Sequence, residues 1–297
     1  YLRSHAFANG ELAEFIASIE ASAGRSLTAW SAAWLETAGA DRIGLDGDVL
    51  TRLAPADHPA DRPHTLDVAA FAGGREVARV DLVIEGERTP VPGLGDLPRG
   101  ALVVPNAGDL TWAEISLDPA TVDGLAASLA EVPDASARSV LWVSLLGAVA
   151  RGEVDPRTVL DVFVSAWPRE ESAAVLSRVA LLVTSQVVPR FLPPAEQEGA
   201  LARIAHAADA LLSRSAGVPG PAGEALAVLA ARVWARTGSD VDRLRRWTEG
   251  DGIPDVLAGD DDFRWAVLRR LATLGLLEDD EIEAAEAARE AAQQTDL

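Results

Sequence analysis

Cysteine is absent from the 297-residue chain, and histidine occurs only four times. Without cysteine there can be no disulfide framework, no thiol nucleophile and no cysteine-based zinc site. The histidines form no H-E-x-x-H motif, which is the usual helical zinc-binding pattern of metallopeptidases. The lack of cysteine favours a reducing cytoplasm as the location of the protein.

Lysine is absent too, so all 26 basic residues are arginine, and they are outnumbered by 46 acidic residues. The formal net charge is −20. Nucleic acids and anionic membrane surfaces are bound by basic faces, so this charge argues against both as partners. No apolar run approaches the roughly 20 residues that a membrane-spanning helix needs, and no signal peptide is recognisable.

Methionine is also missing, and the first residue is Tyr1. Translation begins with methionine, so we expect the chain to be processed, trimmed or cut from a longer polypeptide. What is present near the start supports this expectation, because it is a short helical pair without an evident partner.

The first part of the chain predicts two amphipathic helices. Apolar residues at helical spacing mark residues 11–23, and Gly24 is placed to end that helix. Ser26 can cap a second helix, which carries Trp30 and Trp34. Two helices this short cannot bury their apolar stripes on each other alone, so we expect their packing surface to lie outside the chain.

Residues 41–117 change to the period of two that is typical of strands. The stretch TLDVAAFAGGREVARVDLVIEG predicts two strands joined by a turn at Gly73-Gly74. Two more short strands follow, and proline and glycine are frequent in the loops between them. We therefore predict a small β-sandwich of antiparallel strands.

Residues 118–297 are predicted to be helical throughout. The predicted helices run over about 119–131, 135–150, 156–167, 169–186, 194–214, 222–237, 240–249, 261–275 and 279–294. Asp118-Pro119 and Asp155-Pro156 each offer an aspartate cap followed by proline in the first helical position. Short helices joined by tight turns predict an α-solenoid-like array of the HEAT or armadillo kind, although no strict repeat period is visible. The last helix has few apolar residues besides alanine, so we expect an incomplete array. The predicted fold class is multidomain α+β and mostly α.

No group of residues within the chain points to catalysis. His58 and His64, together with Asp57 and Asp61, could ligate a divalent ion, but their proline-rich surroundings favour a surface loop. No nucleophile motif occurs, and the acidic runs precede helices, where they suit capping. A hydrolase with an unrecognised Ser-His-Asp triad inside the sandwich stays an open alternative.

Tryptophan and arginine are the side chains that could form a binding surface. Six of the eight tryptophans lie on apolar helix stripes and are predicted core anchors: Trp30, Trp34, Trp142, Trp167, Trp234 and Trp265. An arginine of the helical region could hold a carboxylate through two parallel hydrogen bonds, but for each one a solvated or salt-bridged position is the better interpretation. The arginines considered are Arg178, Arg190, Arg203, Arg232, Arg243 and Arg264. Of these we name Arg178, Arg190 and Arg264 as substrate-binding candidates, and we assign no catalytic or metal-ligating residue.

Three segments resemble the aminopeptidase N-type zinc metallopeptidases. Residues 5–39, with Asn9, Leu12, Ile16 and the W-x-x-x-W-L pattern, are similar to the end of that family's catalytic domain. VVPNAGDLTWAEISLD resembles the segment that closes the sandwich and opens the helical domain in bacterial members. FRWAVLRRLATLGLLEDDEIEA resembles a helix pair inside that helical domain.

The resemblance implies the C-terminal region of a zinc aminopeptidase, which removes N-terminal residues from peptides. Residues 1–40 would be the terminal helices of a catalytic domain otherwise absent, 41–117 the β-sandwich and 118–297 the helical domain. That helical domain would pack with the upstream catalytic domain of the same polypeptide, enclose the peptide cavity and control access to it. Zinc is implied for the full-length protein, but the motifs that hold it are not in this sequence, so the chain alone is expected to be inactive.

A free-standing α-solenoid scaffold that binds protein partners, without enzymatic activity, is the alternative. The two orphan helices ahead of the strands favour the peptidase, because a scaffold has no reason to place them there.

Overall fold

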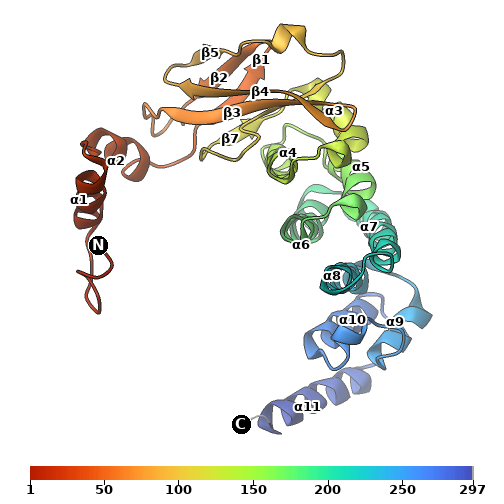
Figure 1. Cartoon of the computed structure of the whole chain (residues 1–297). Coiled ribbons are helices and arrows are strands. Elements are labelled where there is room, and N and C mark those ends of the chain that lie inside the picture. Colours follow the sequence, from red (N-terminus) through yellow and green to blue (C-terminus); the bar gives the residue numbers. More distant parts are fainter. Residues whose placement is uncertain (296–297) are drawn as a thin grey trace. The chain divides into compact units, whose positions relative to one another are not determined.

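The computed structural model describes the backbone of residues 1–295, and the burial of side chains as far as residue 287. The chain divides into two compact units, Tyr1–Asp118 and Pro119–Leu297, and each is described by itself. The first unit contains two helices and all the described strands, and the second is built of helices (Figure 1).

The two predicted N-terminal helices are present as α1, Leu12–Ala23, and α2, Thr28–Leu35. A capping box between Glu11 and Glu14 begins α1. Gly24 ends it with φ 66°, a left-handed conformation that favours glycine. The Ser26 prediction is confirmed in part: the N-cap residue of α2 is Leu27, which makes no side-chain cap, but the Ser26 hydroxyl accepts from the Thr28 N–H at 3.2 Å.

Large apolar side chains of both helices are exposed within the described chain. Leu12 is 51% exposed, Phe15 43%, Trp30 42% and Leu35 44%, whereas Ile16 is buried. The prediction that Trp30 is a core anchor was therefore wrong for this chain. Its helix stripe is real, but the described residues do not cover it.

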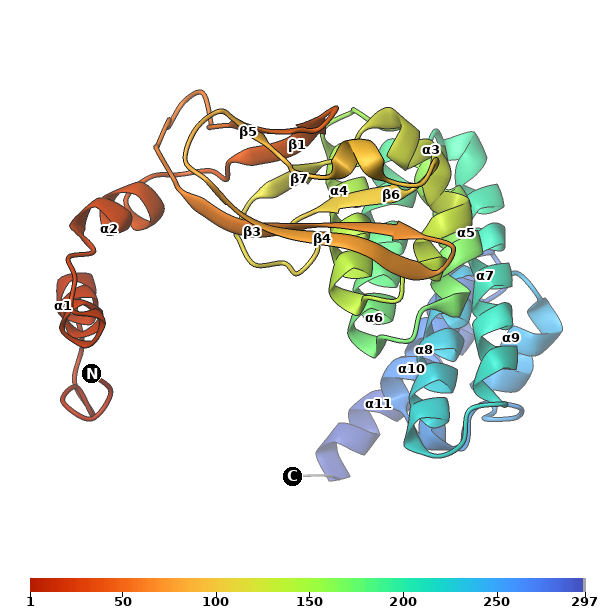
Figure 2. The ribbon, with the colours of Figure 1, turned by 45° about the horizontal axis from the view of Figure 1, so that its top comes forward.

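The strands form two sheets, which lie in separate layers of the first unit (Figure 2). One sheet has the order β5-β2-β1-β7, with β5 at Arg88–Pro90, β2 at Val49–Leu53, β1 at Arg42–Asp46 and β7 at Glu114–Ser116. The strands β1 and β7 are parallel, so the prediction of only antiparallel strands was wrong. The reason is topological: β7 is not joined to β1 by a hairpin but returns to it from the other sheet.

The other sheet has the order β4-β3-β6, with β4 at Arg75–Ile84, β3 at His64–Ala72 and β6 at Leu102–Pro105. The predicted turn between β3 and β4 is confirmed, and Gly73 and Gly74 both have positive φ there. Burial along β3 is nearly continuous rather than alternating, because β3 is the central strand and both of its faces are covered.

The second unit follows the predicted helix boundaries closely. Its helices are α3 Pro119–Ser128, α4 Ala135–Ala150, α5 Pro156–Ala166, α6 Ala173–Leu182, α7 Pro194–Ser215, α8 Pro221–Thr237, α9 Val241–Thr248, α10 Asp261–Thr273 and α11 Asp279–Thr295. Aspartates cap several of them: the carboxylates of Asp155 and Asp260 accept hydrogen bonds from the first-turn N–H groups of α5 and α10.

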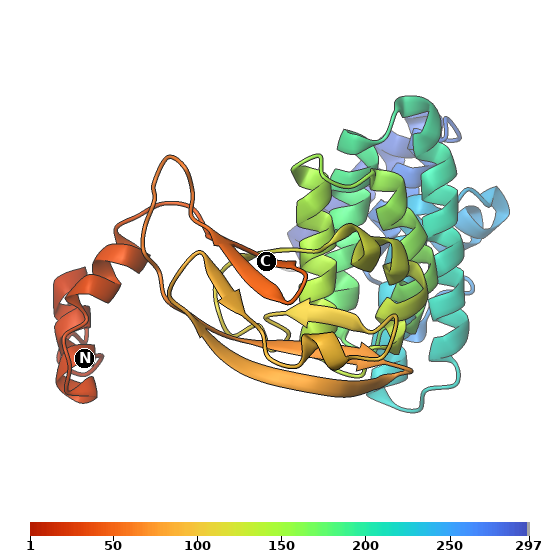
Figure 3. The same ribbon diagram turned by 90° about the horizontal axis from the view of Figure 1, so that it is seen from above.

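Alternate helices of this unit contact one another. α3 contacts α5 and α5 contacts α7, while α4 contacts α6, α6 contacts α8 and α8 contacts α10. Figure 3 shows these helices side by side. Trp142, Trp167 and Trp234 are buried between them, which confirms those core predictions, and Trp34 and Trp265 are only half-buried.

One helical segment departs from the prediction of a single helix over residues 169–186. Residues Val183–Phe191 continue α6 as a π-helix that contains Pro189. Proline lacks the N–H that an α-helix would require at that position, and the hydroxyls of Thr184 and Ser185 donate to carbonyls one turn back. The continuous stretch Ala173–Phe191 has the length and composition of a membrane span, a property that buried helices of globular proteins share.

Candidate functional site

A cavity in the second unit is lined by arginine and hydroxyl side chains together with apolar ones. The cavity, of about 410 Å³, is lined by α6 with its π-helical continuation, α7, α8 and α10. Three arginines contribute to its wall, Arg236 from α8 and Arg269 and Arg270 from α10. The remaining lining residues are Leu181, Thr184, Ser185, Leu201, Thr237, Ala266 and Thr273.

Arg270 is the fixed part of this wall. It is only 4% exposed, its Nε donates to the Gly238 carbonyl at 2.8 Å, and Nη2 donates to the Glu198 carboxylate at 2.9 Å. These bonds tie the end of α8 to α10 and to α7. Arg270 therefore has a structural role and has little capacity left for a ligand.

Arg236 and Arg269 differ from Arg270 because neither forms an ion pair with a side chain that the structure describes. Arg269 Nε donates only to the Trp265 carbonyl in its own helix, at 3.3 Å. Arg236 is exposed, but the neighbouring helices partly desolvate it and so lower its pKa, and the positive charges of Arg269 and Arg232 lower it further. Two arginines thus face the same space in a chain whose net charge is −20.

Such an arrangement can bind an anion. Guanidinium groups match a carboxylate or phosphate through two parallel N–H···O bonds, and an anion between Arg236 and Arg269 would relieve their mutual repulsion. The hydroxyls of Thr184, Ser185 and Thr273 already donate to helix carbonyls, so the arginines are the available donors.

The arginines named from the sequence do not line this cavity. Arg178 lies on α6, Arg190 on the π-helical segment and Arg264 on α10, and all three are exposed. The other three considered are in ion pairs: Arg203 with Asp161, Arg232 with Asp260 and Arg243 with Asp209. The cavity residues were not identified from the sequence, because helical periodicity shows which residues share a face of a helix but not which face lines a cavity.

The two histidines and two aspartates that were noted as possible metal ligands in the sequence do not lie close together either. His64 begins β3 and is fully buried, whereas His58 and Asp57 are exposed, and Asp61 pairs with Arg52. The prediction of a surface loop was wrong for Arg62 and His64, which belong to the core. Among the residues that the structure describes, no three histidine or carboxylate side chains are placed to hold a metal ion.

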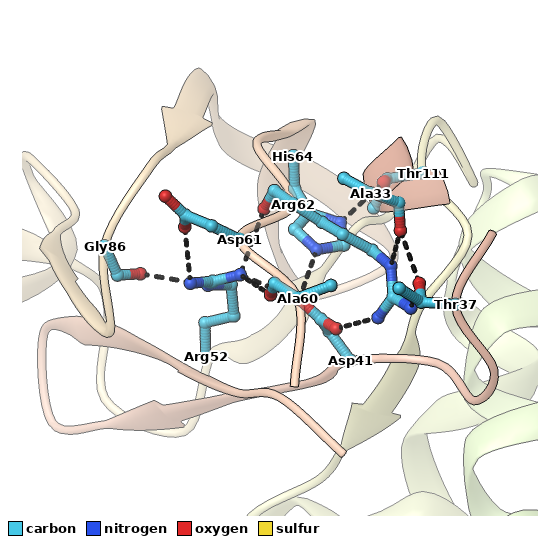
Figure 4. Close-up of polar contacts among 10 residues, drawn as sticks. All are labelled: Ala33, Thr37, Asp41, Arg52, Ala60, Asp61, Arg62, His64, Gly86 and Thr111. Carbon is cyan, nitrogen blue, oxygen red and sulfur yellow. Dashed lines mark hydrogen bonds and ion pairs between the residues drawn. The ribbon is translucent and has the colours of Figure 1, made fainter. Parts of the chain in front are cut away.

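These buried residues form a second polar site, which we call the Asp41 cluster: Asp41, Arg52, Arg62, His64 and Thr111 (Figure 4). Asp41 is fully buried, and its carboxylate accepts from Arg62 at 2.5 Å, from Arg52 at 3.0 Å and from His64 Nε2 at 3.1 Å. Although burial raises the pKa of Asp41, these hydrogen bonds outweigh it and lower the pKa below its usual value.

Comparison with known proteins gives these sites a context. The ERAP1-like C-terminal domain family matches residues 102–296. Aminopeptidase N of Streptomyces lividans is 31% identical over 306 residues, a match that covers 96% of this chain and 35% of that protein. The chain thus spans about a third of the length of this relative. With two thirds of its residues matched by one family and nearly all of them aligned with a bacterial aminopeptidase N, the chain belongs to the ERAP1-like C-terminal domain family and is a C-terminal portion of the aminopeptidase N type.

Proposed function

We propose that this chain is the substrate-enclosing end of a zinc aminopeptidase that removes N-terminal residues from peptides. In this proposal it packs against an upstream catalytic domain, limits which peptides enter, and supplies no catalytic residue of its own. The observation that carries the proposal is the alignment of almost the whole chain with a protein named aminopeptidase N.

The arrangement of elements supports an architectural role. Contacts between alternate helices, α4 with α6, α6 with α8 and α8 with α10, are those of helices stacked in two rows. We therefore interpret the second unit as an α-solenoid-like array of helical repeats, and the two sheet layers of the first unit as a β-sandwich. The three-part division at residues 40 and 117 belongs to the same proposal.

The Arg236–Arg269 cavity is our candidate for the part of this region that contacts substrate. A peptide has a free carboxylate at its C-terminus, and two arginines without ion-pair partners among the described side chains are suited to bind it. Contact at that end would favour peptides whose length spans the distance to the catalytic zinc. Arg178, Arg190 and Arg264 stay secondary candidates, because they are exposed and none of them lines the cavity.

Zinc has no fitting site among the described residues, since no three ligating side chains converge there. Zinc and its ligands would therefore lie in the catalytic domain, and this chain would contribute no residue to the chemical step. A cytoplasmic enzyme that acts on peptides, without a nucleic-acid or membrane partner, agrees with the acidic composition.

The test uses the complete polypeptide that contains this chain. We expect it to release N-terminal residues from peptides, with activity lost on zinc chelation and restored by added zinc. Arg236→Gln and Arg269→Gln should raise KM for peptides with a free C-terminus by about tenfold, since a charge-assisted hydrogen bond contributes about 1.5 kcal/mol. They should leave KM unchanged for C-terminally amidated peptides and for single aminoacyl-coumarins.

Arg246→Gln is the matched control, because Arg246 is an exposed helical arginine on α9 that lies outside the cavity and is not a substrate-binding candidate. Equal KM changes for free and amidated peptides would show that the cavity does not bind the C-terminal carboxylate of the peptide. Absence of any peptidase activity in the complete polypeptide would instead reject the enzyme and favour an interaction scaffold.

A further inference from the structure

Helix α2 is attached to the sheets of the first unit mainly through one buried arginine. Arg62 lies between β2 and β3, and its Nε donates to the Ala33 carbonyl of α2 at 2.8 Å. Its Nη2 donates to Thr37 Oγ1 at 2.5 Å, and the Thr37 hydroxyl donates to the same Ala33 carbonyl. The C-terminal end of α2 is therefore capped by a residue from outside the helix.

His64 lies directly beneath this attachment and is covered by it. The ring of Trp34 on α2 meets the imidazole edge to face, with centroids 5.1 Å apart, and His64 is 0% exposed. Figure 4 shows the His64 imidazole beside the Asp41 carboxylate, which also contacts the Arg62 guanidinium. Solvent can reach the imidazole only if α2 or a neighbouring loop moves.

The contacts of His64 fix the tautomer of its neutral ring. Nε2 lies 3.1 Å from the Asp41 carboxylate, which can only accept, so Nε2 carries the proton. Nδ1 is then the unprotonated nitrogen and accepts from the Thr111 hydroxyl at 2.8 Å. A second proton on Nδ1 would remove this acceptor and oblige the hydroxyl to turn away.

The charges around His64 oppose that second proton. Arg52 from β2 and Arg62 already share the single carboxylate of Asp41, and the other carboxylate near Arg52 is the exposed Asp61. An imidazolium would be a third buried cation against one buried anion. Burial lowers the pKa of His64, and although Asp41 opposes that effect, the arginine charges add to it.

We propose that His64 makes this attachment acid-sensitive, so that α2 detaches from the sheets when His64 takes up a proton. Within the 297-residue chain the rest of α2 offers little resistance, because Trp30 and Leu35 are exposed there and Ser31 is the one buried residue of the helix. Elements with few buried contacts are the ones that open locally while the rest of a domain stays folded. Detachment would leave the imidazolium in water, where its charge is stabilised.

The pH range of the effect follows from the groups that face His64. Asp41, whose pKa is lowered, stays ionised between pH 7 and 5, and arginine, threonine and tryptophan side chains in general do not change charge there. His64 alone changes, and it binds its second proton only in the open form. The equilibrium constant for opening should then increase up to tenfold for each pH unit below about 6.5.

Amide hydrogen exchange of the 297-residue chain between pH 7.5 and 5, corrected for intrinsic exchange rates, tests this directly. We expect protection of residues 28–37 to fall by up to about tenfold per pH unit below about 6.5, while β3 and β4 keep theirs. His64→Gln should flatten that dependence, because an amide can donate to Asp41 and accept from Thr111 without titrating. His58→Gln, an exposed histidine of the same segment, should keep it.

Three results would overturn the proposal. The first is protection of α2 that is constant with pH in the unmodified chain, and the second is a pH dependence that survives His64→Gln. The third is a parallel loss in β3 and β4, which would mean unfolding of the whole unit. Should His64→Gln not fold, the comparison of α2 with the strands in the unmodified chain still decides between these outcomes.

Discussion

At the scale of single residues, Arg62 should be the side chain whose loss destabilises the first unit most. It is 1% exposed and bonds Asp41, Ala33 and Thr37, so Arg62→Ala leaves a buried carboxylate short of a partner and removes the cap of α2. We expect the free energy of unfolding to fall by about 3 kcal/mol in urea titrations.

The matched control for that substitution is Arg88→Ala. Arg88 also pairs with an aspartate, Asp46, at 2.9 Å, but both side chains are more than half exposed. An exposed pair contributes less than about 1 kcal/mol. If the two variants lose equal amounts of unfolding free energy, burial of the Asp41 cluster does not increase its contribution to stability.

The structural role of a residue was predictable from the sequence where that role depends on neighbours along the chain. The caps at Asp155 and Gly24 and the turn at Gly73-Gly74 are local signals, and they were recognised. The cavity arginines were not, because Arg269 and Arg264 look alike in sequence. Only their helix phase relative to α8 places Arg269 on the wall of the cavity and Arg264 outside it.

At the scale of elements, α2 gives two tryptophans very different surroundings. Trp34 packs against His64 and lies 5.8 Å from the Arg62 guanidinium, whereas Trp30 is 42% exposed. We expect Trp30→Ala to lower the free energy of unfolding by less than about 1 kcal/mol and Trp34→Ala by about 2 kcal/mol. Both losses are smaller than the roughly 3–5 kcal/mol of a fully buried tryptophan.

Chemical denaturation of the two variants measures this, with Trp167→Ala as the fully buried reference. A loss of the reference size at Trp30 would mean that its indole is covered within this chain after all. If Trp34→Ala lowers the free energy of unfolding as little as Trp30→Ala does, the contact of Trp34 with His64 contributes nothing to stability.

Helix existence and most boundaries were predictable because periodicity and caps are local. The π-helical segment and the parallel β1–β7 pair were not. Proline at position 189 favours a helix end, because it lacks a backbone N–H, yet the chain continues with wider turns as far as Phe191. Strand direction depends on which sheet the chain returns to, and no local pattern encodes that.

At the scale of the whole molecule, acid should destabilise the helical unit through one buried pair. Glu170 is 3% exposed and accepts from Arg138 through both carboxylate oxygens. Burial raises its pKa, but the bonds from Arg138 and from the Ser172 and Glu171 amides outweigh this and lower it below 4.5.

A lowered pKa in the folded state means that the unfolded chain binds a proton first as the pH falls. The stability that Glu170 contributes is therefore complete above about pH 5.5 and is lost as the pH falls through 4.5 toward the folded pKa. Glu170→Gln should lower stability at pH 7 and weaken the decline between pH 5 and 3 in urea titrations. Glu85→Gln, at an exposed position, should do neither. A decline unchanged in Glu170→Gln would place the acid sensitivity elsewhere.

The last prediction separates this chain from the enzyme to which we assign it. The described residues offer no cluster of three metal-ligating side chains, and the sequence has no H-E-x-x-H, so the 297-residue chain should retain well under one zinc per molecule after desalting. It should also fail to cleave aminoacyl-coumarins. We expect the complete polypeptide to bind zinc and to cleave these substrates. Elemental analysis and a fluorogenic assay on the two proteins in parallel decide the matter. Stoichiometric zinc in the 297-residue chain would show that it carries a metal site of its own, and activity without zinc would revive a hydrolase inside the first unit.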